Sequence, residues 1–437
     1  MSYIYWFECS YLVPNDEVSA RRDIDDPDLL ETLEQCYALV RDGSRPNTDT
    51  LLSRYMKRPM FDNLKLRITR MDHNLLDIIW PVTKKLPEDV IDEDLKEIIE
   101  ENGGVVIPDY ETYFVFADLL QPIIKDLHGL IVTYELNTQP GTMFFEPADK
   151  YGENRSQCSA DDVRRVKVDP ISRWVVSGHV ECTRNLKLFQ LPACMSLSQL
   201  ETMERDLLNI LDPEVDVRNA ISSNQQGTYY RLDEIMSDGS GLRSKLDSED
   251  LSIPLSDANY EGLLHGAHWP HGRGVYIYNG YTMAVWINVQ DHIRILSRVD
   301  STGDVGQAYE RISKSVTSLN EHFRFKRDPY LGFLTSRPSA LGNTLRFYIT
   351  LYLPKLGNEE GKLKQLCSVR YLNVRKVRDR DDSFRIYNKQ NLSINELQTF
   401  REFTAAVSNI LQLEKNLTTN SQPQNTSGGL FNIFKKK

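Results

Sequence analysis

The chain has 437 residues, 40% of them hydrophobic, and a net charge of −10. This is enough apolar material for a large core, and the length allows two or three domains. The negative charge argues against a general nucleic-acid-binding protein. No stretch approaches about 20 consecutive apolar residues, and the first ten residues lack the pattern of a signal peptide, so we expect neither a membrane span nor secretion.

Cysteine usage indicates a reducing compartment. The six cysteines are scattered, and no two of them form a C-x-x-C pair. This pattern favours reduced thiols over disulfides or a zinc site. They are Cys9, Cys36, Cys158, Cys182, Cys194 and Cys367. We therefore expect a cytoplasmic protein without a metal site.

The N-terminal part of the chain has the apolar spacing of helices. Apolar residues that recur every three or four positions predict helices over residues 28–41, 51–66, 75–82 and 110–127. A stretch rich in Lys, Asp and Glu, residues 83–101, lies between the last two, and Gly103 and Gly104 follow it. We expect a helical domain that contains a charged insertion.

Polar residues, Gly and Pro dominate residues 131–165, which we interpret as a mobile interdomain connection. The pattern then changes to a strand within 166–188 and to a helix over 197–211, with Ser196 or Ser198 as its N-cap. Strands and helices alternate irregularly from there on, which indicates an α+β domain.

Residues 331–356 predict a strand, a tight loop and a second strand. The loop carries Arg337 and Arg346, and a guanidinium beside a glycine-bearing turn suits carboxylate or phosphate oxygens. Residues 416–437 are rich in Asn, Ser, Thr, Gln and Gly and end in an apolar cluster and three lysines. We expect this tail to be disordered, with docking to a partner as the alternative.

Several motifs in the same order resemble the phosphagen (guanidino) kinases, the arginine kinases above all. L-T-S-R-P-S-A-L-G-N-T-L-R, residues 334–346, resembles the family's L-T-x-C-P-[ST]-N-L-G-T-x-[LM]-R. W-I-N-V-Q-D-H-I-R, residues 286–294, resembles W-[VI]-N-E-E-D-H-L-R, the part of the family motif V-W-[VI]-N-E-E-D-H-L-R that follows its first valine. W-P-H-G-R-G at 269–274, G-T-Y-Y at 227–230 and a block within 387–415 also match. The resemblance covers most of 166–415 and, more loosely, 48–130.

This resemblance implies the guanidino kinase fold, an α+β architecture. A small helical N-terminal domain would precede a larger C-terminal domain, in which helices flank an antiparallel sheet. The expected division is an N-terminal extension, a helical domain, a linker with an insertion, a catalytic-type domain and a disordered tail, at residues 1–45, 46–130, 131–165, 166–415 and 416–437.

The resemblance also implies a nucleotide site built from five arginines, with ATP or ADP and magnesium as its occupants if any nucleotide binds. Arg294, Arg346 and Arg375 stand at three of these positions. In S-G-H-V-E-C, residues 177–182, the family has S-[ST]-R-V-R-[CT], so that Ser177 is kept while His179 and Glu181 replace two arginines. Each lost charge-assisted hydrogen bond costs about 1.5–3 kcal/mol. We expect nucleotide affinity to be strongly reduced.

The catalytic positions differ as well. Gln290 stands where the family has the glutamate that orients and deprotonates the guanidinium, and Arg337 stands where it has the reactive cysteine. An amide is no base near neutral pH, and a cation repels a guanidinium. The last flexible loop has lost two glycines and a glutamate at residues 375–380. Gly103 and Gly104 resemble in part the loop that meets the guanidino substrate.

Two hypotheses follow. In the first, the chain is a catalytically inactive pseudokinase with a binding or structural role, whose insertions and tail are candidate surfaces for an unknown protein partner. In the second, it is an active ATP:guanidino phosphotransferase in which Asp291 or another carboxylate replaces Gln290. Arg294 could also be part of a structural ion pair, and we interpret Arg337 as a solvated loop arginine rather than an anion contact. The oligomeric state stays open.

Overall fold

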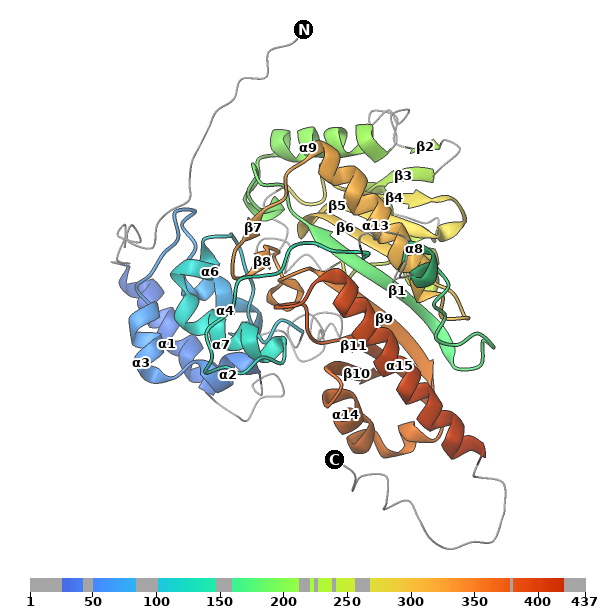
Figure 1. Cartoon of the computed structure of the whole chain (residues 1–437). Coiled ribbons are helices and arrows are strands. Elements are labelled where there is room, and N and C mark those ends of the chain that lie inside the picture. The colour runs from blue at the N-terminus through green and yellow to red at the C-terminus, as the bar shows by residue number, and fades with distance from the viewer. Residues whose placement is uncertain are drawn as a thin grey trace, which may run out of the picture. The chain divides into compact units, whose positions relative to one another are not determined.

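The computed structural model describes residues 26–41, 50–83, 101–146, 159–211, 221–223, 227–237, 241–255, 268–377 and 380–419. The chain divides into two compact units. The first contains Met1–Asp126 together with Ser336–Pro338, and the second contains Leu127–Thr335 and Ser339–Lys437. Figure 1 shows their helices and strands.

The first unit is helical, as the apolar spacing predicts. Its described helices are α1 (Pro27–Arg41), α2 (Leu51–Tyr55), α3 (Arg58–Leu64), α4 (Leu75–Thr83), α6 (Thr112–Val115) and α7 (Ala117–Leu127). The helix predicted over 51–66 is two helices, because a proline at the start of α3 favours a new helix there. Leu33, Phe61, Ile78 and Ile123 are fully buried in this unit. The charged insertion lies outside the described residues, apart from its first residue and its last.

The second unit is organised around a nine-stranded sheet with the order β10-β11-β9-β1-β6-β5-β4-β3-β2. Every pairing between its neighbours is antiparallel. The strands are β1 (Val175–Arg184), β2 (Ile221–Ser223), β3 (Gly227–Arg231), β4 (Gly274–Tyr278), β5 (Met283–Val289), β6 (Asp291–Val299), β9 (Leu345–Tyr352), β10 (Leu372–Lys376) and β11 (Ser383–Asn388). A separate pair joins β7 (Arg327–Asp328) to β8 (Gly332–Phe333). The predicted α+β fold with a helical N-terminal domain is confirmed.

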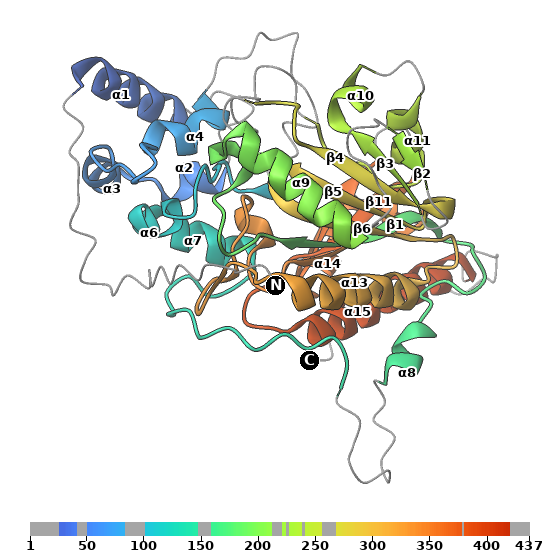
Figure 2. The same cartoon turned by 90° about the horizontal axis from the view of Figure 1, so that it is seen from above.

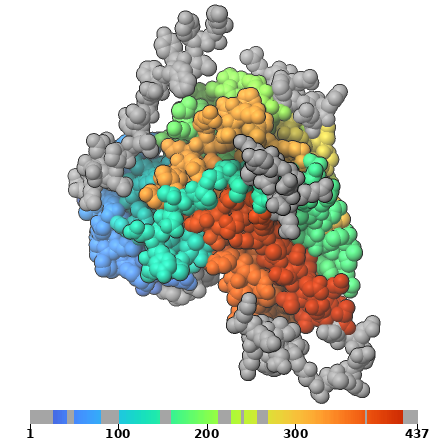
Figure 3. Space-filling view, in the orientation of Figure 1, coloured from blue at the N-terminus to red at the C-terminus, as the bar shows by residue number. Residues whose placement is uncertain are grey.

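Helices cover both faces of this sheet (Figure 2). The described helices of the second unit are α8 (Ala160–Arg164), α9 (Leu197–Leu211), α10 (Leu232–Met236), α11 (Leu242–Ser248), α13 (Val305–His322), α14 (Glu360–Ser368) and α15 (Glu396–Thr419). On one face, Phe347 of β9 stacks on Phe403 of α15 with ring centroids 4.9 Å apart, and Tyr309 of α13 packs beside them. In Figure 3, α15 forms a continuous red band over this face.

On the opposite face, α10, α11 and residues 251–255 cover β4, β5 and β6. Trp286 is buried in this layer and donates through Nε1 to the carbonyl oxygen of Leu251 (3.0 Å). The remainder of this face, over β1, β9 and β11, carries polar side chains on alternating positions. That polar region contains most of the residues predicted to form the nucleotide site.

The helix predicted over 197–211 is α9, and Ser196 is its N-cap. Ser196 Oγ accepts from the backbone N–H of Gln199 (3.4 Å), and Gln199 Oε1 accepts from the backbone N–H of Ser196 (3.0 Å). These two hydrogen bonds form a capping box, which satisfies the free donors at the start of the helix. The alternative N-cap, Ser198, lies inside the first turn.

Two predicted segment boundaries can be compared with the described residues. The backbone of Met143 donates to Glu396 (2.9 Å) and accepts from Leu397 (2.9 Å), so this part of the predicted connection contacts α15, while its mobility stays a prediction. The helix α15 continues to Thr419, beyond the predicted start of the tail at 416, because buried Glu414 binds the backbone N–H groups before α14 and holds the last turns. Residues 147–158 and 420–437 lie outside the described part. No described helix has the length and apolar character needed to cross a membrane.

Candidate functional site

Strand β1 places three predicted site residues on one face of the sheet. Ser177, His179 and Glu181 alternate along the strand, so their side chains point to the same side. Residues directly opposite on an antiparallel neighbour share that side. His179 is opposite Tyr348, and Glu181 is opposite Arg346 of β9.

The same register brings in further cations. Arg294 of β6 is opposite Thr183, Arg385 of β11 is opposite Thr350, and Arg375 of β10 is opposite Arg385. We call this region the arginine face, defined by Ser177, His179, Glu181, Arg294, Arg346, Tyr348, Arg375, Arg385 and Tyr387. The structure therefore brings together the six residues that the resemblance predicted for the nucleotide site, and it adds Arg385 and two tyrosines.

Glu181 and Arg294 form an ion pair on the arginine face. Nη2 of Arg294 donates to Oε2 of Glu181 (2.8 Å). Glu181 is fully buried, and Arg294 is 7% exposed. This distance is typical of a charge-assisted hydrogen bond, which is about twice as strong as a neutral one. The structural interpretation of Arg294 is thus supported, because the guanidinium already has an anionic partner within the protein.

A second carboxylate, Asp250, reaches the same face from the loop after α11. Its Oδ1 lies 2.9 Å from Nη2 of Arg385 and 3.4 Å from Nδ1 of His179. Burial by itself would raise the pKa of Asp250, but the guanidinium of Arg385 and the imidazole of His179 lower it well below its usual range. Asp250 is therefore an anion near neutral pH.

Arg346 lies among aromatic rings. It donates through Nη1 to the carbonyl oxygen of Ser339 (2.7 Å) and through Nε to the hydroxyl of Tyr348 (3.3 Å). Its guanidinium carbon is 5.7 Å and 5.3 Å from the ring centroids of Tyr348 and Tyr387, which are themselves stacked. Such cation–π contacts stabilise a buried cation without neutralising it.

The turn between β5 and β6 carries the position of the expected catalytic carboxylate. Val289 pairs with Asp291, and Gln290 between them has a left-handed backbone, with φ of 66°, and is buried. Asp291 is fully buried, and its Oδ1 accepts from Nδ2 of Asn185 (2.7 Å). That hydrogen bond directs one oxygen of Asp291 toward Asn185.

His292, the next residue, has a structural environment. Its Nδ1 accepts from the backbone N–H of Leu186 (2.9 Å), and its Nε2 lies 2.6 Å from the carbonyl oxygen of Gln190. Burial lowers the pKa of His292 to about 4, so the imidazole is neutral, with its proton on Nε2. His292 is therefore a buried histidine whose two ring nitrogens both contact backbone groups.

The interpretation of Arg337 as a solvated loop arginine is wrong, because this residue is only 7% exposed. Gly103 and Gly104 have left-handed backbones with φ of 70° and 90°. A Cβ at Gly104 would lie 2.9 Å from Thr50 Oγ1, so the local fold of the first unit requires glycine there. Contact of this glycine loop with a guanidino substrate stays a prediction.

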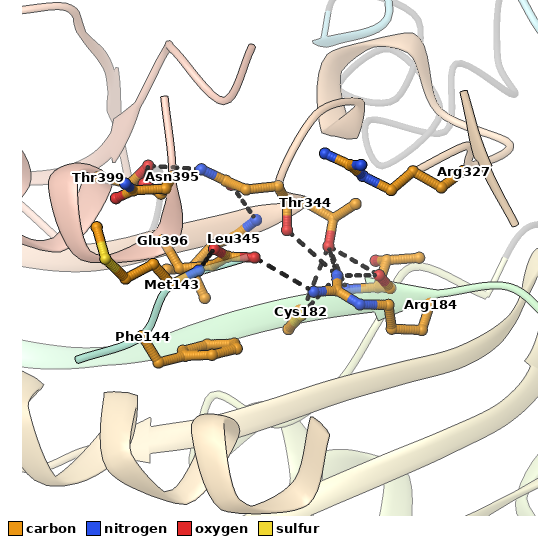
Figure 4. A network of polar contacts seen from close by, with 12 residues as sticks. Met143, Phe144, Cys182, Arg184, Arg327, Thr344, Leu345, Asn395, Glu396 and Thr399 are labelled. Atoms are coloured by element: carbon orange, nitrogen blue, oxygen red, sulfur yellow. Dashed lines mark hydrogen bonds and ion pairs between the residues drawn. The ribbon is translucent and has the colours of Figure 1, made fainter. Parts of the chain in front are cut away.

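Sequence reasoning missed a buried ion pair that holds the loop before β9 (Figure 4). Arg184, at the end of β1, is fully buried, and its Nη2 lies 3.6 Å from Oε1 of Glu396 in α15. Its Nη1 donates to Thr344 Oγ1 (2.5 Å), and its guanidinium carbon is 3.8 Å from the ring centroid of Phe333. These contacts anchor Thr344 two residues before Arg346 and so help to position the arginine face.

The donor set of the arginine face does not fit a nucleotide polyphosphate. Among the cations predicted to hold phosphate, Arg294 is paired with Glu181, and the position of a further arginine is His179 beside Asp250. Two buried carboxylates, Glu181 and Asp250, lie on or beside this surface, and carboxylates repel the negatively charged phosphate groups of a nucleotide. Within the described residues, no group of three or more His, Cys, Asp or Glu side chains is arranged to hold a metal ion.

Comparison with known proteins agrees with the fold and the motifs. Residues 46–125 match the ATP:guanido phosphotransferase, N-terminal domain, and residues 214–417 match the ATP:guanido phosphotransferase, C-terminal catalytic domain. The chain is similar to Arginine kinase 1 of Drosophila melanogaster, with 28% identity over 397 residues that cover 90% of this chain and 99% of that protein. Arginine kinase Lit v 2.0101 of Penaeus vannamei is also 28% identical, over 398 residues, with the same coverage of both chains.

Solved structures show the same fold. The duplicated taurocyamine kinase from Schistosoma mansoni, with bound transition state analog components, superposes with a TM-score of 0.70 at 20% identity and over 90% of this chain. The match spans 50% of that duplicated chain. A crystal structure of lombricine kinase has a TM-score of 0.62 at 19% identity and covers 86% of this chain and 94% of that one. With both domain matches and the expected architecture in place, this chain belongs to the ATP:guanido phosphotransferase family.

Proposed function

We propose that this chain is an arginine kinase-like pseudokinase, a family member that does not catalyse ordinary phosphoryl transfer to a guanidino compound and serves a binding or structural role. The carrying observation is the buried pair between Glu181 and Arg294, at 2.8 Å. Phosphoryl transfer needs cations that remain available to the phosphates and to the charge that develops in the transition state. In this chain the carboxylate of Glu181 already binds one of those cations, Arg294.

The catalytic side of the site supports the same proposal. Gln290 offers an amide where a carboxylate would have to orient a guanidinium and accept its proton. Asp291 is the nearest carboxylate in sequence, but it is fully buried and hydrogen-bonded to Asn185. A base that already accepts a buried hydrogen bond is a poor replacement for Gln290.

The alternative is an active ATP:guanidino phosphotransferase. It is favoured by the presence of Arg294, Arg346 and Arg375 on one face of the sheet and by the arginine kinase relatives, which cover 90% of the chain. If it is active, ATP with magnesium is its phosphoryl donor. On this alternative, the pair between Glu181 and Arg294 would have to open whenever a nucleotide bound.

The binding role requires a partner. We propose an unidentified cytoplasmic protein that binds through the charged insertion, the segment around 147–158 or the C-terminal tail. The first two are charged or polar, the tail is polar except for the apolar cluster near its end, and none of the three has a counterpart in the motifs that the chain shares with its family. These segments lie outside the described residues, so the proposal rests on their composition alone.

The test is a phosphoryl-transfer assay on the purified full chain. ATP and magnesium are supplied with arginine, creatine or taurocyamine, and phosphorylated guanidine is followed by phosphorus NMR beside an arginine kinase relative. We expect no product above the protein-free blank. Turnover that Arg294→Ala abolishes would refute the pseudokinase proposal and establish the alternative.

A further inference from the structure

Two carboxylates on or beside the arginine face accept hydrogen bonds from its arginines. Glu181 accepts from Arg294 at 2.8 Å, and Asp250 accepts from Arg385 at 2.9 Å while lying beside His179. Both carboxylates are more than nine-tenths buried. Nitrogen–oxygen distances of about 2.7–2.9 Å are those of a charge-assisted bond from a guanidinium to a carboxylate or a phosphate oxygen.

The two carboxylates come from different parts of the chain. Glu181 lies in the middle of β1, whereas Asp250 follows α11 and has a left-handed backbone with φ of 58°. A left-handed conformation is uncommon for aspartate, although aspartate and asparagine adopt it more readily than most residues. It brings the carboxylate of Asp250 to His179 and Arg385, so that two separate anions converge on one cationic surface.

Arg294 retains hydrogen-bonding capacity in this arrangement. Only its Nη2 bonds to Glu181, and its Nε is buried without a hydrogen-bond partner among the described residues. A guanidinium usually binds an oxyanion through two parallel N–H groups. The contact with Glu181 therefore neutralises the charge of Arg294 without using its full donor set.

We propose that Glu181 and Asp250 act as internal substitutes for a phosphate ligand and close the arginine face to polyphosphates. An incoming polyphosphate must displace both carboxylates from their cations and then remain next to two fixed negative charges. The inference rests on the proposed function, because it takes the arginine face as the surface on which an active relative would hold its polyphosphate. Asp250 is on this view a specificity-determining residue that excludes polyanions.

The experiment neutralises both carboxylates without changing their shape. The full chain carrying Glu181→Gln and Asp250→Asn, and each single variant, are titrated with inorganic tripolyphosphate and pyrophosphate by calorimetry at constant ionic strength. The control is Glu321→Gln with Glu402→Gln, two exposed carboxylates on α13 and α15 at the other face of the sheet, which change the net charge equally. Circular dichroism checks that every variant is folded.

We expect the double variant to bind tripolyphosphate at least about tenfold more tightly than the wild type and the control, with the single variants between them. Adding Arg294→Gln to the double variant should remove the gain, which locates it on the arginine face. If the double variant does not fold, a gain in either single variant supports the proposal, and the absence of a gain in both overturns it.

Two other outcomes also overturn the inference. One is a wild-type affinity for tripolyphosphate equal to that of the folded double variant, and the other is a gain no larger than that of the control. Both of these outcomes are measured by binding and not by catalysis. The pseudokinase proposal is tested separately, because it is refuted only by guanidine phosphorylation by the wild-type chain. An inactive wild type whose double variant gains no affinity refutes the internal-substitute inference alone.

Discussion

Replacing Arg294 by alanine tests the buried ion pair directly through stability. In the native chain, Arg294 neutralises Glu181, which has no exposed surface. The substitution removes the cation and leaves a carboxylate in the interior. Such a charge must be protonated, rehydrated by local opening, or kept at a large free-energy cost.

The structure sets the size of the effect. Removing one partner of a buried pair typically costs about 3–5 kcal/mol in the free energy of unfolding, because the other charge is left uncompensated. An exposed pair contributes at most about 1 kcal/mol. Lys362 and Glu359 form such a pair, with side chains 69% and 59% exposed, so Lys362→Ala is the matched control. The double variant Arg294→Met with Glu181→Leu should lose less stability than Arg294→Ala, since it leaves no buried charge.

The assay is urea unfolding followed by tryptophan fluorescence. Trp174 and Trp286 are buried in the second unit and report on its unfolding. We expect the midpoint of this transition to fall far more in Arg294→Ala than in Lys362→Ala. A loss of stability in Arg294→Ala no greater than that of the control would show that Glu181 is not held as a buried anion by Arg294, and the reasoning about the arginine face would be wrong.

Three further predictions concern single elements. Asp109 accepts from His73 at 2.7 Å and, although burial acts in the opposite direction, raises the pKa of His73. The stabilisation from this pair is therefore complete below the unfolded-state pKa of about 6.5 and is lost as the pH rises through the higher folded-state value. The free energy of unfolding, measured with urea from pH 5.5 to 8.5, should fall with rising pH in the wild type, and His73→Asn should lack this fall. Ser196→Ala removes the cap of α9 and should cost about 1 kcal/mol by the same unfolding measurement, whereas Ser196→Asp should restore most of it. Phe403→Ala empties a core position against Phe347 and should cost about 3–5 kcal/mol; a loss below about 1 kcal/mol would contradict the packing of α15 on the sheet.

Local pattern was sufficient for several elements. Apolar spacing predicted the helix α1, and Ser196, one of the two serines considered as N-cap, marked the start of α9. The alternation of Ser177, His179 and Glu181 along a strand also placed these side chains on one face. Each of these features depends on residues only a few positions apart, so the sequence carries the whole signal.

The family motifs allowed residues of the candidate site to be predicted from the sequence. They identified the position of Glu181 as one where the charge is reversed, and they placed Arg294, Arg346 and Arg375 with it. Arg385 could have been added from the alternation of residues 383–388, which puts it on the same side as Tyr387. The family motifs do not include Arg385, so the resemblance alone does not identify it.

Only the tertiary structure decided what the altered residues contact. The pairing of Glu181 with Arg294 and the approach of Asp250 to Arg385 depend on the strand order, the register and a left-handed residue after α11. The ion pair between Arg184 and Glu396 likewise joins a strand to a helix far along the chain. The reason is physical: local propensity determines which residues form a strand or helix, whereas the electrostatic partner of a buried charge is determined by which distant segments pack against it.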